Sequence, residues 1–182
     1  MGVPVVLVPY DPRWPQLYDE EKTRILGAIG EYVVAVEHIG STAVPGLGAK
    51  PILDIMIAVR DLAKDFPLCI EPLRAIGYEY VPRSDFFESR FCCLGTWGAS
   101  DRHLHITELN SNFWREKLLF RDYLRAHPHA ANDYFELKQT LAERHSGNRP
   151  AYTEAKATFI QQVVQRANKG VTSGANTSHQ VR

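Results

Sequence analysis

EHIGSTAVPGLGAKPILDIM, residues 37–56, divides into the end of a strand, a glycine-rich loop and the start of a second strand. The alternating, β-branched run at 32–39 predicts a strand, and the three glycines and one proline within 40–50 predict a loop. Residues 51–59 are almost continuously apolar, which is typical of a buried strand. Asp54 interrupts this run, so we expect one carboxylate on a buried strand next to the loop.

The loop and the second strand bring together groups that suit a phosphate ligand. Glycines such as Gly40 let the backbone approach an anion closely, and the Ser41 hydroxyl can donate to phosphate oxygens. Asp54 can hold a divalent ion that bridges those oxygens, and Lys50 adds a positive charge. The alternatives are an ordinary tight turn at Gly40-Ser41, a solvent-exposed Lys50 and a structural ion pair at Asp54.

Outward from this stretch, the chain alternates between short apolar runs and helical periods. We expect strands at 4–10, 78–81, 90–94 and 102–107, and helices after Asp11-Pro12, at 66–76, from 112 to before Pro128, around 134–142 and at 152–167. Asp11 is the expected cap of the first helix. The predicted fold class is α/β (α+β), a mixed β-sheet flanked by helices with a C-terminal helical segment, in one domain over residues 1–167. Residues 168–182 are polar and unpatterned, which predicts a disordered tail.

Bulk composition excludes several classes of protein. The 182 residues carry 21 Lys and Arg against 21 Asp and Glu, so the formal net charge is zero. General nucleic-acid binding usually needs a basic excess, so we expect a small-molecule substrate as the partner. No apolar run approaches the roughly 20 residues of a membrane span, and we expect a cytoplasmic protein without membrane contact. Cys69, Cys92 and Cys93 are expected to be unpaired apolar residues in a reducing compartment, and no pattern predicts the oligomeric state.

The string over residues 37–55 resembles the GrpB (UPF0157) family of the nucleotidyltransferase superfamily. Further matching pieces are RHLHI at 102–106, LLFRDYLRAHP at 118–128, LKQTLAERH at 137–145 and YTEAKATFI at 152–160, so the resemblance covers roughly residues 5–165. It implies a nucleotidyltransferase-type fold, in which a Gly-Ser turn precedes a strand with two carboxylates one residue apart. A third carboxylate stands on a later strand, and the three hold two metal ions during nucleotidyl transfer.

Carried onto this chain, the resemblance places Gly40 and Ser41 at the phosphate turn and Asp54 at the first carboxylate. Met56 stands at the second carboxylate position, and its thioether does not suit a hard cation. His105 is the expected equivalent of the third carboxylate. Two of the three carboxylates are therefore missing.

The histidines change the metal that this site would favour. Imidazole prefers Zn²⁺, Mn²⁺, Fe²⁺ or Ni²⁺ over Mg²⁺. Residues two apart on a strand share a face, so His103 and His105 can both face Asp54. We expect a mixed site for one divalent ion, Zn²⁺, Mn²⁺ or Mg²⁺, with Asp54, His103, His105 and His38 as candidate ligands. The alternative is that the two strand histidines are polar-face residues of an edge strand.

Glu37 and Arg90 complete the candidate set. Glu37 adjoins His38, and strand alternation lets only one of the two face the site. Arg90 flanks the site region and can bind an anionic substrate, although a surface arginine is equally ordinary. The candidate catalytic residues are therefore Asp54, His105 and Glu37, and the candidate phosphate- or substrate-binding residues are Gly40, Ser41, Lys50 and Arg90.

Two functions from different classes follow. The first is a metal-dependent, nucleotidyltransferase-like enzyme acting on a nucleoside triphosphate or another small anionic substrate. The second is a non-catalytic module that binds a nucleotide or metal or assists a partner. Relatives fused to dephospho-coenzyme A kinase and the missing carboxylates favour the second function, whereas the retained Gly40, Ser41, Lys50 and Asp54 favour the first.

Overall fold

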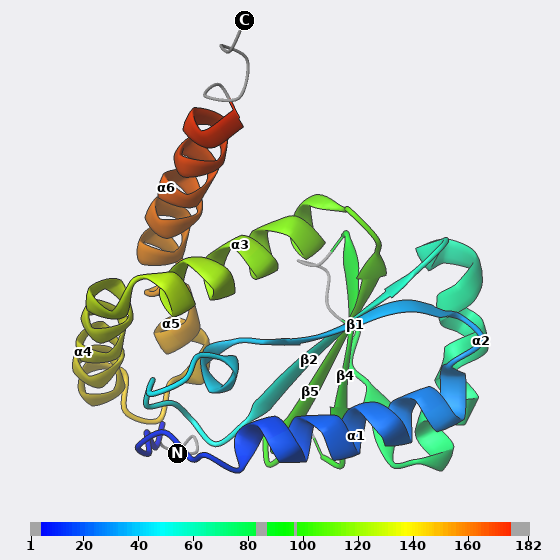
Figure 1. The fold of residues 1–182 in the computed structure, drawn as a ribbon. Coiled ribbons are helices and arrows are strands. Elements are labelled where there is room, and N and C mark those ends of the chain that lie inside the picture. The colour runs from blue at the N-terminus through cyan, green and yellow to red at the C-terminus, as the bar shows by residue number, and fades with distance from the viewer. Residues whose placement is uncertain (1–4, 83–86, 97, 176–182) are drawn as a thin grey trace, which may run out of the picture.

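A five-stranded mixed sheet forms the centre of the molecule (Figure 1). The computed structural model describes residues 5–82, 87–96 and 98–175. The strands are β1 (Val33–Ile39), β2 (Leu53–Val59), β3 (Tyr78–Tyr80), β4 (Ser89–Leu94) and β5 (Arg102–Glu108), in the order β1-β2-β5-β4-β3. β2 and β5 pair in parallel, and the other pairs are antiparallel. The predicted fold class, a mixed sheet flanked by helices, is confirmed.

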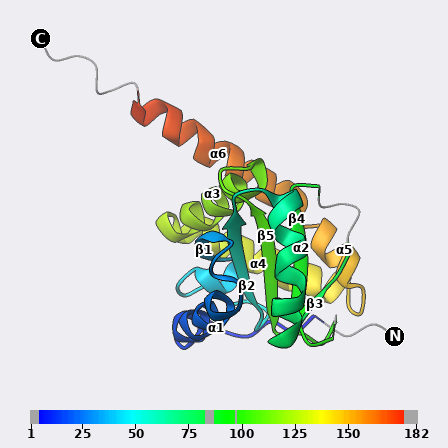
Figure 2. The same ribbon diagram turned by 90° about the vertical axis from the view of Figure 1, so that its right-hand side faces the viewer.

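Helices flank the sheet on both faces. They are α1 (Trp14–Ile29), α2 (Leu62–Ala75), α3 (Asn112–Ala126), α4 (Pro128–Arg144), α5 (Arg149–Glu154) and α6 (Ala157–Ala175). Figure 2 shows α2 in front of the strands and α6 leading away from the body of the molecule. None of the helices in the described part of the chain is both long and apolar enough to cross a membrane.

The larger part of the core lies between the sheet and helices α1 and α2. Successive strand residues point to opposite faces, so Ile55 and Ile57 of β2 pack with Leu104 and Ile106 of β5 against these helices. All four side chains are completely buried. Cys69 and Cys92 belong to the same cluster, and both are free thiols, as predicted.

The other residues of the same strands face α3 and the C-terminal helices. Met56 and Ala58 pack against Trp114 of α3, and a further cluster around Leu124 and Tyr134 joins α3 to α4. Asp54 lies on this face, where the helices leave space beside the sheet. The fold therefore places one charged strand residue opposite the C-terminal helices.

At the N-terminal end, two boundaries differ from the prediction. In the described part of the expected strand at 4–10, residues 5–10, the pairing is a single bridge between Val8 and Ala49. α1 begins at Trp14, and Asp11 does not cap it, because the Asp11 carboxylate accepts hydrogen bonds from the Arg13 backbone and guanidinium. The first helix therefore starts two residues later than its predicted beginning at Pro12.

Helix boundaries also differ further along the chain. α2 starts at Leu62, before the predicted residue 66, because the Asp61 carboxylate accepts hydrogen bonds from the first turn. The single helix predicted at 152–167 is two helices, α5 and α6, which break at residues 155–156. α6 continues to Ala175, so the tail predicted from residue 168 begins within a helix, and residues 176–182 lie outside the described residues.

Arg121 fastens α3 to the first strand. Its side chain is 8% exposed, and Nη1 donates to Glu37 Oε2 at 2.5 Å and to the His38 carbonyl oxygen at 2.9 Å. Nε donates to Asp122 Oδ1 at 2.8 Å. One guanidinium thus satisfies a strand carboxylate and a strand carbonyl across the α3–β1 contact.

Replacing Arg121 by Met should lower the free energy of unfolding by about 2–3 kcal/mol, because a half-buried carboxylate and a buried carbonyl lose their donor. Arg115→Met is the matched control on the same helix, since the Arg115 side chain is exposed and donates only to Asn112 among the hydrogen bonds of the described residues. That change should cost less than about 0.5 kcal/mol. Urea unfolding of both variants measures the difference, and equal losses would contradict the role assigned to Arg121.

Candidate functional site

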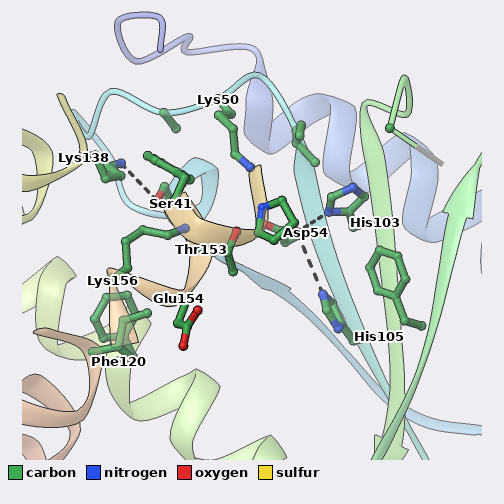
Figure 3. Close-up of a pocket in the computed structure, with 18 of the residues that line it drawn as sticks. Ser41, Lys50, Asp54, His103, His105, Phe120, Lys138, Thr153, Glu154 and Lys156 are labelled. Carbon is green, nitrogen blue, oxygen red and sulfur yellow. Dashed lines mark hydrogen bonds and ion pairs between the residues drawn. The ribbon is translucent and has the colours of Figure 1, made fainter. Parts of the chain in front are cut away.

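Asp54 sits near the start of β2, where three segments meet (Figure 3). The antiparallel register pairs Asp54 with Ile39, the last residue of β1, and the parallel register pairs it with His103 of β5. The Gly40 turn follows Ile39 directly and therefore lies against the Asp54 side chain. The adjacency of loop and strand predicted from the sequence is present in the structure.

Both histidines of β5 face Asp54, as strand alternation predicted. His103 Nδ1 lies 3.1 Å from Asp54 Oδ1, and His105 Nε2 lies 4.0 Å from the same oxygen. The Phe91 ring of β4 packs against both imidazoles, with ring centroids 5.0 Å from His103 and 5.1 Å from His105. An aromatic wall therefore fixes the two imidazoles on one side of the carboxylate.

The carboxylate of Asp54 is held in its ionised form. Burial alone would raise the pKa of Asp54, but the hydrogen bond with His103 and the charges of His103, His105 and Lys50 hold that pKa well below its usual range. Because the carboxylate is the acceptor, His103 Nδ1 carries the proton of this hydrogen bond. Asp54 therefore remains a fixed negative charge across the physiological pH range.

Gly40 is required by the close approach of the turn to Asp54. Its φ of 72° lies in the left-handed region, and a Cβ at this position would overlap Asp54 Oδ2 and lie 3.0 Å from Asp54 Cβ. Ser41 then begins the short 3₁₀ turn η1 (Ser41–Ala43). The absence of a side chain at Gly40 thus lets the Ser41 turn pack directly against the Asp54 carboxylate.

A cavity of about 900 Å³ opens beside these residues. Its floor is the Gly40–Ser41 turn with Asp54, His103 and His105, and its other walls come from the loop before β2 and from α3, α4, α5 and α6. Lys50, Lys138 and Lys156 all line it, together with Tyr134, Tyr152 and Phe120. With Glu154 of α5, the cavity therefore combines two carboxylates, two imidazoles, a serine hydroxyl, three ammonium groups and aromatic surface.

Lys138 of α4 is the most buried of these cations, at 2% exposed. Its Nζ donates to Ser41 Oγ at 3.1 Å and to the Gly48 carbonyl oxygen at 2.6 Å. Burial, with the nearby charges of Lys156 and Lys50, lowers the pKa of Lys138 to about 7. This lysine both holds the loop in place and supplies a cation whose charge is poised near neutral pH.

Lys156 and Lys50 approach the same space from other segments. Lys156 stands at the break between α5 and α6, and burial followed by the charge of Lys50 lowers its pKa to about 8. The ammonium groups of both lysines lie over the Tyr152 ring, at 4.6 Å for Lys156 and 5.5 Å for Lys50. Three cations from separate parts of the chain therefore line one cavity, where Lys50 and Lys156 lower the pKa of Lys138 and Lys50 lowers the pKa of Lys156.

Glu37 and His38, both predicted at the site, are engaged elsewhere and do not line the cavity. Glu37 points to the same face as Asp54, but its carboxylate accepts the Arg121 guanidinium. His38 points to the α1 face, where its ring stacks on Tyr18 with centroids 4.7 Å apart. The predicted catalytic role of Glu37 and the predicted metal role of His38 therefore have no geometric support.

The environment of His38 indicates a structural role. Burial lowers the pKa of His38 to about 4, so the ring is neutral at physiological pH. Thr42 Oγ1 donates to the Ile52 carbonyl oxygen at 3.3 Å, so the His38 Nε2–H donates to Thr42 Oγ1, 3.0 Å away. His38 thus holds the loop in position from the face of the sheet that α1 covers.

Arg90, the predicted substrate contact, also lies away from the cavity. In β4 its neighbour Phe91 faces the cavity, so Arg90 points to the opposite face. Its guanidinium lies over the Phe66 ring of α2 at 5.9 Å and donates to the carbonyl oxygens of Phe87 and Ser89. Arg90 therefore does not line this cavity, whereas Gly40, Ser41 and Lys50 do.

Lys138 and Lys156 were not among the candidate site residues predicted from the sequence. Lys138 occupies an apolar position of the α4 period, spaced with Tyr134 and Leu141, and a lysine on a buried helical face is a signal that could have been used. Lys156 gave no such signal, because the break between α5 and α6 was not predicted. Their convergence on the cavity depends on how the C-terminal helices pack.

The donor set does not fit the two-metal centre that the fold implies. Among the described residues that line the cavity, Asp54 is the only carboxylate contributed by a strand. Met56, at the expected second carboxylate position, is buried against Trp114, and the residue expected at the third position is His105. Among the residues that the structure describes, no group of three or more His, Cys, Asp or Glu side chains is placed to hold a metal ion. The Asp54–His103 pair is the part of the predicted mixed-ligand centre that is in direct contact, and metal binding stays a prediction.

The fold and the glycine-serine turn define a protein with the nucleotidyltransferase-type architecture. The chain belongs to the GrpB family, whose model, described as GrpB protein, matches residues 4–166. A UPF0157 protein of Halalkalibacterium halodurans is 37% identical over 165 residues, covering 90% of this chain and 83% of the relative. The glutamate-rich protein GrpB of Alkalihalophilus pseudofirmus is 33% identical over 163 residues, covering 88% and 94%. A dephospho-CoA kinase of Mycolicibacterium paratuberculosis is 31% identical over an alignment 188 residues long, gaps included. The alignment covers 90% of this chain and 46% of the kinase.

Solved structures agree with this assignment. The conserved protein GrpB from Enterococcus faecalis superposes with a TM-score of 0.82 at 33% identity, covering 91% of this chain and 99% of that chain. The Cid1 poly(U) polymerase superposes with a TM-score of 0.53 at 15% identity, covering 84% of this chain and 49% of the polymerase. At that identity the polymerase shares the fold alone, which is the nucleotidyltransferase fold predicted from the sequence.

The close approach of Gly40 to Asp54 can be tested with two glycine variants. Gly40→Ala should lose about 2–4 kcal/mol of stability, because it combines left-handed backbone strain with overlap at Asp54. Gly46→Ala is the matched control, since Gly46 has a φ of 78° but no atom within 4 Å of an added Cβ. The control should lose only about 1–2 kcal/mol, the cost of the backbone strain. Thermal and urea unfolding measure both, and identical losses would show that Asp54 does not constrain the turn.

Proposed function

We propose that this chain binds a nucleoside triphosphate, or a related phosphorylated small molecule, in the cavity and transfers its nucleotidyl group to an acceptor. The observation that carries the proposal is that one cavity is lined both by Ser41 with Lys138 and Lys156 and by Asp54 with its two histidines. Anionic phosphates suit the first group, and a reacting hydroxyl suits the second. Membership of the GrpB family and the nucleotidyltransferase fold support this proposal without specifying the substrate.

The proposed reaction is one displacement at phosphorus. An acceptor oxygen forms a bond to the α-phosphorus while the bond from that phosphorus to the bridging oxygen of the β-phosphate breaks. Pyrophosphate leaves beside the lysines, and the acceptor proton passes to the imidazole of His103 or His105, next to the ionised Asp54 carboxylate. Ser41 and Lys138 hold the leaving phosphates, and Asp54 with its two histidines orients the acceptor.

A second candidate function is a binding module without turnover. Two observations favour it: Met56 stands buried where the superfamily has a carboxylate, and a homologous region forms part of a dephospho-CoA kinase chain. Such a module would bind the phosphorylated ligand with the same lysines and release it unchanged. Turnover, and not binding, separates the two functions.

Pyrophosphate release from each of the four nucleoside triphosphates tests the enzymatic function. We expect release by the wild type with at least one of them, and a loss of about 100-fold or more in Asp54→Ala and in His105→Ala. Asp133→Asn is the control, because Asp133 is an exposed carboxylate of α4. The assay is run with Mg²⁺, Mn²⁺, Zn²⁺ and a chelator. Binding without pyrophosphate release under every condition would favour the binding module instead.

The affinity for ATP should fall as the pH rises through the lysine pKa values. Lys138, whose pKa is about 7, and Lys156, whose pKa is about 8, must be protonated to hold an anion. They are surrounded by Lys50, Lys117, Asp54 and the Glu154 carboxylate that also lines the cavity. Above these pKa values each binding event has to take up protons, so the dissociation constant should rise roughly 50-fold between pH 7 and pH 8.5.

Calorimetric titration with ATP across this pH range checks the prediction. Lys138→Met should bind more weakly at pH 7 and show a flatter profile, because one of the two titrating cations is gone. A profile in the wild type that is flat, or that rises with pH, would remove these lysines from the binding site.

A further inference from the structure

We propose that the cavity takes its phosphorylated ligand as the free anion, with Lys50, Lys138 and Lys156 as the counterions in place of a divalent metal. This inference rests on the proposed function, since it concerns the ligand of the same cavity. It departs from the two-metal arrangement that the fold implies. Its basis is the placement of cationic and anionic groups around the cavity.

The single strand carboxylate is already engaged by protein groups. Asp54 Oδ1 accepts from His103 Nδ1 at 3.1 Å, and His105 Nε2 lies 4.0 Å from the same oxygen. A divalent ion at this oxygen would have to displace the His103 proton. It would also lack a second carboxylate on β2, because Met56 occupies the next position on the same face of that strand.

Cations already surround the space where phosphates would lie. Lys138 Nζ lies 3.1 Å from Ser41 Oγ, so the serine hydroxyl and an ammonium group form one phosphate-binding point. The Ser41 and Gly48 hydrogen bonds use two of the three N–H groups of that ammonium. Lys156 and Lys50 add two further charges over the Tyr152 face.

These charges repel one another, and this repulsion favours an anion over an additional cation. Lys156 and Lys50 lower the pKa of Lys138, and Lys50 lowers that of Lys156, after the effect of burial in each case. A bound phosphate relieves the repulsion, whereas a divalent ion in the same partly buried space increases it. The electrostatic balance of the cavity therefore selects a ligand that brings negative charge and no metal.

Calorimetry with ATP, AMP and inorganic pyrophosphate tests this inference on the full-length chain. The protein is first dialysed against EDTA, and each titration is repeated with Mg²⁺ and with Mn²⁺ in excess. At least one of these ligands should bind in EDTA, with a dissociation constant within about threefold of the value measured with either metal. Mn²⁺ titrated alone should give no saturable heat.

Three variants separate lysine-based binding from metal-based binding. Lys138→Met and Lys156→Met should each weaken binding in EDTA about tenfold or more, because each removes a charged hydrogen-bond donor. Asp54→Asn removes the negative charge that a metal would need, and we expect its binding to be equal to that of the wild type or tighter. Lys64→Met is the control, because Lys64 lies on α2 and pairs with Asp61. Thermal melting confirms that each variant is folded before it is compared.

Each outcome has a definite meaning. Binding in EDTA that is weakened by the lysine variants and kept by Asp54→Asn supports the inference. Binding that requires Mg²⁺ or Mn²⁺ and is lost in Asp54→Asn overturns it while leaving the proposed function intact. No binding of ATP, AMP or pyrophosphate to the folded wild type under any condition overturns the proposed function, and the inference with it.

Discussion

The register between β1 and β2 determines the arrangement of the whole site. Pairing Ile39 with Asp54 places the Gly40 turn directly on the carboxylate, and the absence of a side chain at Gly40 makes this contact possible. A slip of one residue would turn Asp54 towards α1 and α2, where the core is apolar. The alternation of β2, with Ile55 and Ile57 buried on the other face, holds the register, so core packing and site geometry have the same cause.

The loop between these strands is held by the C-terminal helices as much as by the sheet. Arg125 of α3 donates to the Ala43 carbonyl oxygen at 2.9 Å, and Lys138 of α4 donates to that of Gly48 at 2.6 Å. His38 supports the loop through Thr42 from the opposite face. A glycine-rich segment that would be mobile by itself is thus fixed at several carbonyl and hydroxyl groups, which pre-organises Ser41 for a ligand.

What the sequence could predict followed from periodicities within single elements. The strands around Asp54 and the shared face of His103 and His105 are local consequences of alternation, and the structure agrees with them. The roles of Glu37 and Arg90 depended on partners that a strand pattern does not contain: the guanidinium of Arg121, 84 residues from Glu37, and the face of β4 that α2 covers. Lys138 and Lys156 could not be assigned to the site from the sequence, because only helix packing brings them to the cavity.

The burial of Lys138 also bears on how this protein would respond to selection for stability alone. Lys138 is 2% exposed, and its pKa is lowered to about 7. Keeping this buried side chain charged therefore lowers the stability of the folded state. A redesign that optimises folding, or a consensus built for thermostability, would replace it with an apolar residue of similar length. The more stable protein would then have lost a cation of the proposed binding cavity. A lysine that persists at this position across engineered or natural variants would therefore indicate that the cavity is in use.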